Sequence, residues 1–123
     1  MGNHVVAYDP AKSRDYKSYV KTEALKVKPD RLLEGPISLT VRVYRSIPKS
    51  FGKRKTEQAI NGEIRPVTKP DLDNIIKGVK DALKSIIWKD DSQVVDFGQT
   101  SKWYSDMPRV EVEVKVIDTV PMR

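Results

Sequence analysis

Cysteine is absent from this sequence, and histidine occurs once, as His4. Without thiolates the chain can form neither a disulfide nor a cysteine-based zinc site, and one histidine cannot replace those ligands. Long apolar runs are absent too, because none approaches the roughly 20 residues that cross a bilayer. The opening residues lack the basic-then-apolar pattern of a secretory signal. We therefore expect a cytoplasmic protein with no membrane-spanning segment.

Several familiar catalytic motifs are also missing. The sequence has no Gly-rich phosphate loop, no nucleophile elbow and no serine–histidine pair, so we expect no nucleotide cofactor. An EF-hand match begins at Asp71-x-Asp73 and then fails. Ile75 and Ile76 stand where that loop needs a ligand and a glycine.

Length and charge allow one domain with an anionic partner. With 123 residues, 38% of them hydrophobic and 33% charged, the chain fits a single globular domain over residues 1–123. Its net charge is +6 and its pI is near 9.5. A basic surface favours a polyanion through release of counterions. On charge alone, both nucleic-acid binding and no particular partner remain open.

Hydrophobic periodicity predicts an α+β fold. Helical spacing of apolar residues and period-two alternation indicate two types of element. We predict helices over 13–27 and 72–86, and strands over 37–44, 94–100 and 110–116. This order indicates a small mixed or antiparallel sheet that two helices cover on one face.

The apolar rhythm disappears from Arg45 to Lys69. This segment carries a run of basic residues against two acidic ones. The basic residues are Arg45, Lys49, Lys53, Arg54, Lys55, Arg65 and Lys69. We predict a long loop with a short helix over 53–59 and a turn at Asn61-Gly62. Long loops are either functional or mobile, and both interpretations are open here.

Two pairs of aspartates flank the predicted helix over 72–86: Asp71 and Asp73 before it, Asp90 and Asp91 after it. In a structural interpretation Asp73 is the N-cap and pairs with Lys77 one turn later, which contributes about 0.2–0.5 kcal/mol. Asp90 and Asp91 then belong to an ordinary turn. Capping gives no reason for Asp71 or for the second pair.

A functional interpretation uses the same spacing. If the strand that begins near Asp91 runs back toward the start of the helix, its carboxylate joins Asp71 and Asp73. Three carboxylates repel one another unless they hold a hard cation such as Mg²⁺ or Mn²⁺. Phosphodiester hydrolysis uses such a cation, and Lys77 can stabilise charge on the phosphate. From the residues alone, both interpretations stay open.

Longer segments resemble a known family. The sequences KPDLDNIIKGVKDAL and IWKDDSQVV together resemble the signature of the RusA family of Holliday junction resolvases, endodeoxyribonucleases often carried by phages and prophages. The segments IPKSFGKRK, NGEIRPVTKPDLDN and KWYSDMPRVEVEV occur in the family's order. The resemblance extends from about Val6 to Val116.

The resemblance implies a homodimer that cuts four-way DNA junctions by paired symmetric nicks with Mg²⁺ or Mn²⁺. It assigns metal binding and catalysis to Asp71, Asp73 and Asp91, with Lys77 as a further catalytic residue and Asp90 as an open fourth ligand. A two-fold pair of sites suits the two-fold symmetry of a junction.

The basic segment would then bind DNA. In this interpretation it contacts backbone phosphates and Phe51 stacks on an unpaired base, although an exposed Phe51 without a partner is the alternative. The phosphate-binding residues would be Lys49, Lys53, Arg54, Lys55, Arg65 and Lys69.

The N-terminus departs from the family pattern. Family members begin with a strand and a basic segment ahead of the first helix, whereas this chain opens with GNHVVAYDPAKSRDYKSYV. We therefore expect the N-terminal strand to be missing. Two other functions remain open: a non-catalytic DNA-binding protein derived from such a nuclease, and a nuclease of other branched DNA.

Overall fold

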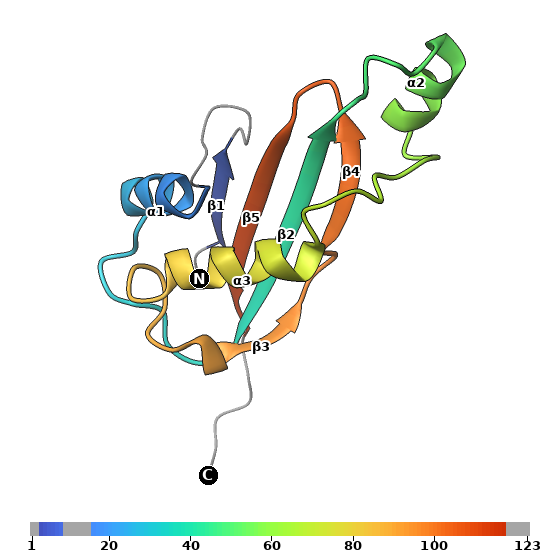
Figure 1. The fold of residues 1–123 in the computed structure, drawn as a ribbon. Helices are drawn as coiled ribbons and strands as arrows, with labels where there is room; N and C mark the ends of the chain where they lie inside the picture. The colour runs from blue at the N-terminus through green and yellow to red at the C-terminus, as the bar shows by residue number, and fades with distance from the viewer. Residues whose placement is uncertain (1–2, 9–15, 118–123) are drawn as a thin grey trace.

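The structure is a computed structural model, and it describes residues 3–8 and 16–117 (Figure 1). The elements in chain order are β1 Asn3–Tyr8, α1 Tyr16–Lys26, β2 Ile37–Ser46, α2 Lys53–Ile60, α3 Leu72–Leu83, the 3₁₀ turn η1 Asp91–Gln93, β3 Val94–Phe97, β4 Ser101–Ser105 and β5 Arg109–Val116. The α+β prediction is confirmed. Across these described ranges, no helix has the length and apolar character to cross a bilayer.

The five strands form one mixed sheet around β2. Strand β5 runs antiparallel to β2 on one side, and β1 runs antiparallel to β5. On its other side β2 pairs in parallel first with β3 and then, from Arg42 onward, with β4. Between β3 and β4 the backbone crosses Thr40 closely, and a Cβ at Gly98 would lie 1.9 Å from the Thr40 hydroxyl oxygen. Glycine is therefore required at this crossing.

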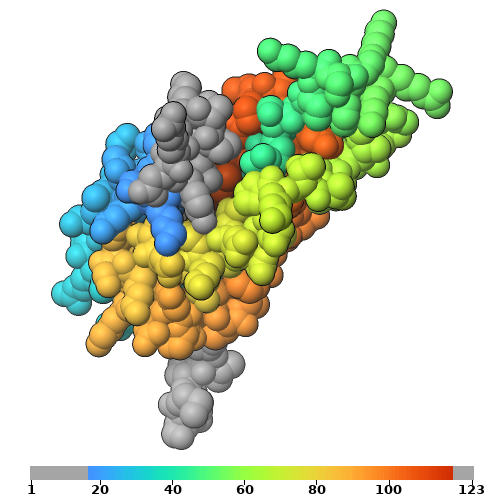
Figure 2. Space-filling view, in the orientation of Figure 1, coloured from blue at the N-terminus to red at the C-terminus, as the bar shows by residue number. Residues whose placement is uncertain are grey.

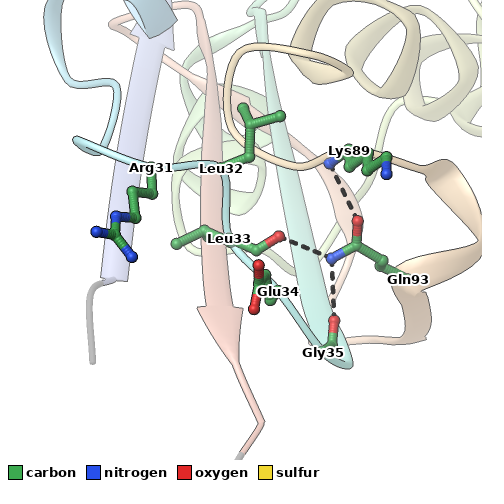
Figure 3. Close-up of a pocket in the computed structure, with 7 residues that line it drawn as sticks. All are labelled: Arg31, Leu32, Leu33, Glu34, Gly35, Lys89 and Gln93. Atoms are coloured by element: carbon green, nitrogen blue, oxygen red, sulfur yellow. Dashed lines mark hydrogen bonds between the residues drawn. The ribbon is translucent and has the colours of Figure 1, made fainter.

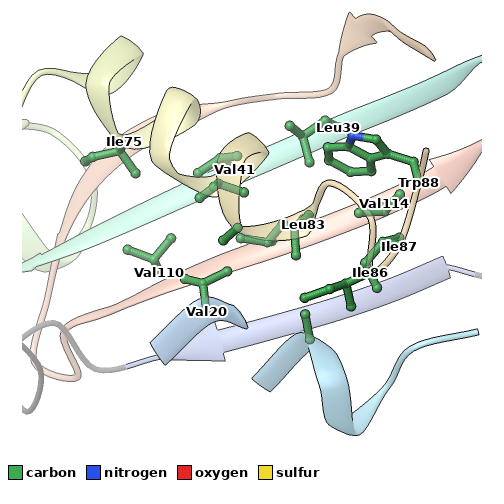
Figure 4. Close-up of a cluster of buried hydrophobic side chains, with 14 of the residues drawn as sticks. Val20, Leu39, Val41, Ile75, Leu83, Ile86, Ile87, Trp88, Val110 and Val114 are labelled. Carbon is green, nitrogen blue, oxygen red and sulfur yellow. The ribbon is translucent and has the colours of Figure 1, made fainter. Parts of the chain in front are cut away.

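One face of the sheet is covered by α1 and α3, as expected (Figures 1 and 4). The inward residues of β2 and β5 are fully buried against both helices, and each such side chain contributes roughly 1.5–3 kcal/mol on burial. They are Ile37, Leu39, Val41, Val43, Val110, Val112 and Val114. Val20 of α1 and Val79 of α3 belong to the same core and contribute to it from the helices.

The prediction that the N-terminal strand is missing was wrong. Residues Asn3–Tyr8 form β1, whose register along β5 runs from Asn3 opposite Lys115 to Tyr8 opposite Val110. The apolar residues Val5, Val6 and Ala7 are consecutive, so the segment has no period-two pattern to indicate a strand. Pairing with the free edge of β5 makes it a strand.

Helix boundaries also differ from the predictions. The predicted start of the first helix at Ser13 lies outside the described residues, and α1 ends at Lys26. Helix α3 ends at Leu83, three residues before Ile86, because Ser85 adopts a left-handed φ of 69° and its N–H donates to the Trp88 carbonyl. The turn folds Ile86, Ile87 and Trp88 back into the core, so an apolar pattern continues where the helix has stopped.

On the uncovered face of the sheet, Glu111 of β5 joins two arginines. Arg109 Nε donates to one carboxylate oxygen of Glu111 at 2.8 Å, and Arg42 Nε donates to the other at 3.2 Å. The hydrogen bond from Arg109 lowers the pKa of Glu111; burial opposes this shift and Arg42 adds to it. A lowered pKa stabilises the fold above the ordinary glutamate value near 4.5, and this stabilisation disappears as the pH falls through the folded-state pKa.

We expect Glu111→Gln to lower the free energy of unfolding by about 1 kcal/mol at neutral pH, with the difference narrowing in acid. Urea unfolding at neutral pH and at successive values below about 4.5 would measure this. Asp96→Asn on exposed β3 is the matched control, because within the described residues Asp96 makes no ion pair. A difference that stays constant with pH would show that the charge of Glu111 contributes nothing.

Candidate functional site

Asp71, and not Asp73, occupies the N-cap position of α3. Its backbone is extended, with φ −66° and ψ 144°, and its carbonyl accepts from Ile75 N–H at 3.2 Å. Its side chain makes no capping hydrogen bond. Among the ion pairs of the described residues, none joins Asp73 to Lys77. The structural interpretation of Asp73 was therefore wrong, and helix capping does not explain either carboxylate.

A surface pocket of about 270 Å³ lies between α3 and η1. Its lining contains acidic and basic side chains around one isoleucine. The residues are Asp73, Ile76, Lys77, Lys80, Asp81 and Asp91. The structure thus brings together Asp73, Lys77 and Asp91, which come from two segments of the chain, whereas Asp71 does not line this pocket.

The pocket also contains Asp81 and Lys80, which sequence reasoning missed. Asp73, Lys77 and Asp81 follow one another at intervals of four residues, so they share one face of α3. That spacing is visible in the sequence and could have identified Asp81. The carboxylate of Asp81 lies 3.5 Å from Lys17 Nζ of α1, an ion pair exposed to solvent.

The side chain of Asp91 accepts a hydrogen bond from a residue of the core. The indole N–H of Trp88 donates to Asp91 Oδ1 at 2.8 Å, and the Trp88 side chain is fully buried. Trp88 belongs to the turn after α3, and Asp91 begins η1. This contact directs a core side chain at an acidic residue of the pocket.

Asp90 has a different role from its neighbour. Its Oδ1 accepts from Ser92 N–H at 3.0 Å, while Gln93 Oε1 accepts from the N–H of Asp90 at 2.9 Å. These two contacts form a capping box for η1. The hydrogen bond from Ser92 lowers the pKa of the Asp90 carboxyl. Asp90 therefore caps η1, and it does not line the pocket that contains Asp91.

Gln93 connects η1 to the segment that precedes β2 (Figure 3). Its amide nitrogen donates to the carbonyls of Leu33 at 2.8 Å and Gly35 at 3.1 Å. Its amide oxygen also accepts from Lys89 N–H at 3.0 Å. Gln93 therefore satisfies backbone groups on both sides of a second pocket, of about 310 Å³. Sequence reasoning noticed the motif that contains Gln93 without assigning this role.

The basic segment after α2 is packed along β4. The Arg65 guanidinium stacks on Trp103 at 3.4 Å from the ring centroid, and its Nε donates to the Lys102 carbonyl at 2.6 Å. Lys102 Nζ in turn donates to the carbonyls of Thr68 and Pro70, at 2.5 and 3.1 Å. Gly62, with φ +76°, approaches Trp103 so closely that a Cβ would lie 3.0 Å from the ring. These contacts attach the segment between α2 and Asp71 to β4.

Helix α2 forms within the basic segment, as predicted, and protrudes from one end of the molecule (Figures 1 and 2). Phe51 packs edge-on against Tyr104, with ring centroids 5.6 Å apart. Lys55 Nζ lies 4.2 Å from the centroid of the Phe51 ring. The alternative of a partnerless Phe51 was therefore wrong. Six basic residues of the segment are exposed: Lys49, Lys53, Arg54, Lys55, Arg65 and Lys69.

The donors in the α3–η1 pocket fit a hard divalent cation. Over the described ranges, no three acidic or histidine side chains are grouped closely enough to bind a metal by themselves. Mg²⁺ is commonly held by one or two carboxylates, with water and substrate phosphate in the remaining positions. Asp73 and Asp91 supply two such carboxylates to one pocket. An open site of this kind suits catalysis better than a closed structural site.

Comparison with known proteins identifies the family of the chain. The model of a family described as endodeoxyribonuclease RusA matches residues 1–115. The chain belongs to the RusA family. A relative of this RusA chain, the uncharacterized protein YqaN of Bacillus subtilis (strain 168), is 52% identical over 111 residues, which cover 89% of this chain and 78% of YqaN. The resemblance seen in the sequence is thus confirmed, and membership of an endodeoxyribonuclease family supports nuclease activity.

We expect Gln93→Glu to destabilise this RusA family member by about 2 kcal/mol, because a carboxylate oxygen would face the carbonyls of Leu33 and Gly35 in place of an N–H donor. For a domain of this size, that loss lowers the melting temperature by several degrees. Thermal unfolding followed by circular dichroism measures it. Gln99→Glu introduces the same charge at an exposed position and serves as control. Equal melting temperatures for the two variants would contradict the role given to Gln93.

Proposed function

We propose that this protein is a metal-dependent endonuclease that resolves four-way DNA junctions by paired symmetric nicks. The observation that carries the proposal is the pocket in which Asp73 and Lys77 of α3 meet Asp91 of η1. Helix capping does not account for the Asp71 carboxylate, since its side chain makes no capping hydrogen bond. Family membership supports a substrate of branched DNA.

Asp73, Lys77 and Asp91 of the pocket have roles in this proposal. Asp73 and Asp91 hold Mg²⁺ or Mn²⁺, and Asp71 is a third acidic residue of the site on the strength of the family resemblance. A cation held there would supply an activated water and would neutralise phosphate oxygens. Lys77 lies in the same pocket, where its ammonium group can bind a non-bridging phosphate oxygen and stabilise charge on it.

The protruding basic segment is the proposed DNA-binding surface. Lys53, Arg54 and Lys55 are exposed on α2, at the end of the molecule that Figure 2 shows in green. Such side chains bind backbone phosphates without reading sequence. Arg65 and Phe51 contribute indirectly, because their contacts with Trp103 and Tyr104 join the segment to β4.

A homodimer completes the proposed mechanism. One pocket contains a single set of catalytic residues, and it can cut one strand in each encounter. Two identical pockets related by a two-fold axis would present the same chemistry to two strands of like polarity. A four-way junction has this approximate symmetry.

We expect Asp73→Asn to lower the rate of junction cleavage by roughly 100-fold or more, because it removes a metal ligand. Binding of the junction should be retained or improved, since a negative charge near the DNA is lost. The assay uses a synthetic mobile four-way junction and a matched linear duplex, with Mg²⁺, Mn²⁺ or EDTA. Asp96→Asn removes the same charge from exposed β3, outside the pocket.

The products of this assay decide between related functions. Paired symmetric nicks that need metal and wild-type Asp73 support a resolvase. Full cleavage by Asp73→Asn would exclude the proposed site. Binding without nicks under every metal would indicate a non-catalytic DNA-binding protein, and cleavage restricted to flaps would indicate a nuclease of other branched DNA.

We expect simultaneous substitution of Lys53, Arg54 and Lys55 by alanine to weaken binding to all junction sequences about equally. The slope of log K against log salt should fall by up to about 2.7, since each phosphate contact contributes about 0.9. Fluorescence anisotropy at several salt concentrations measures both quantities. The control replaces three exposed lysines outside this segment: Lys21, Lys28 and Lys115. Equal losses in the two triple variants would show a general charge effect rather than a binding surface on α2.

A further inference from the structure

We infer that Trp88 is a positioning residue for Asp91: its buried indole N–H holds one carboxylate oxygen so that the other is presented to the cation. This inference rests on the proposed metal site. It adds a residue that neither the family resemblance nor the acidic motif assigns. Trp88 itself touches neither metal nor DNA in this arrangement, because its side chain is fully buried.

The direction of the contact is unambiguous. An indole Nε1 carries a hydrogen and can only donate, so Asp91 Oδ1 must be the acceptor at 2.8 Å. Within the described residues, Asp91 Oδ2 receives no hydrogen bond, and Asp91 lines the pocket. One oxygen is therefore fixed by the core while the second is available to a ligand.

The indole is itself held firmly. The Trp88 carbonyl accepts from Ser85 N–H at 2.7 Å, and Leu33 N–H donates to the neighbouring Ile87 carbonyl at 2.7 Å. The ring lies in the core with Leu39 and Val114 (Figure 4). A donor with so little freedom restricts the rotation of the carboxylate that it binds. The loss of side-chain freedom then occurs on folding rather than on metal binding.

Asp73 provides the internal comparison. It lines the same pocket from the first turn of α3, yet no hydrogen bond or ion pair to its side chain occurs among the described residues. The two proposed ligands therefore differ: Asp91 is oriented in advance and Asp73 is free to adjust. Partners that orient a metal ligand typically change metal affinity by about 10–100-fold when they are removed.

A purely structural role for the contact makes a different prediction. A buried indole N–H needs an acceptor, and Asp91 would then serve the core alone. Replacing Trp88 would lower stability and leave metal affinity unchanged. The two roles can therefore be separated by measuring metal binding and stability on the same variants.

The test measures Mn²⁺ affinity of the full chain without DNA, by electron paramagnetic resonance, for wild type, Trp88→Phe and Tyr44→Phe. In each variant phenylalanine keeps an aromatic ring and removes a polar hydrogen, and Tyr44 lies against Arg109, outside the lining of the pocket. We expect Trp88→Phe to weaken Mn²⁺ binding about 10-fold and Tyr44→Phe to leave it unchanged. At saturating Mn²⁺, Trp88→Phe should recover most of its junction cleavage. Unchanged affinity in a folded Trp88→Phe variant, or no Mn²⁺ binding by wild type, would overturn the inference.

A second measurement keeps Trp88 in place and so does not depend on whether Trp88→Phe folds. In the Trp103→Phe variant, Trp88 is the remaining tryptophan. Titration with Mg²⁺ should change its emission, because the cation and the indole share the Asp91 carboxylate. Adding Asp91→Asn should abolish the change. Trp88 fluorescence that does not change when Mg²⁺ is added would contradict the inference.

The inference and the proposed function fail separately. If Mn²⁺ affinity depends on Trp88 but wild type cuts no junction, the positioning role stands and the resolvase proposal falls. If wild type cuts junctions while Trp88→Phe has the same Mn²⁺ affinity as wild type, the resolvase proposal stands and the positioning role is wrong.

Discussion

The burial of Trp88 is the constraint on which the rest of the site depends. The chain reverses after α3 at Ser85 and returns the indole to the sheet, where it is fully buried. Because a buried indole N–H requires an acceptor, the next turn must bring one within reach, and Asp91 does so at 2.8 Å. Gln93 then attaches that turn to the segment before β2. Packing in the core thus determines where an acidic side chain stands at the surface.

Two charged regions carry the proposals. Asp73, Asp81 and Asp91 lie between α3 and η1 together with two lysines, while exposed basic residues gather on α2, which protrudes from the sheet. Phosphates are attracted to the second region and repelled by uncompensated carboxylates in the first. The proposed divalent cation would allow phosphate to approach both regions, since it would neutralise the carboxylates and bind phosphate oxygens as well. This electrostatic requirement links the metal proposal to the DNA-binding proposal.

Elements with strong periodic patterns were predicted well from the sequence. The alternation in β2 and β5 and the apolar face of α3 follow from burial on one side, which local spacing records. Strand β1 lacks alternation, and its pairing with β5 joins residues more than a hundred positions apart. The five residues of β4 are all half-buried, so they too lack a clear pattern. These two strands depend on the sheet edges that accept them, which no local window contains.

The sequence by itself determined the α+β class, the family and the acidic motif, because these depend on residue types in order along the chain. The tertiary structure decided what each aspartate does. Asp90 and Asp91 are neighbours of identical chemistry, yet one caps η1 and the other accepts from Trp88 and lines the pocket. Asp81 enters that pocket while Asp71 does not. Such differences arise from the turn after α3 and from contacts between distant segments, which set the direction of a side chain independently of its identity.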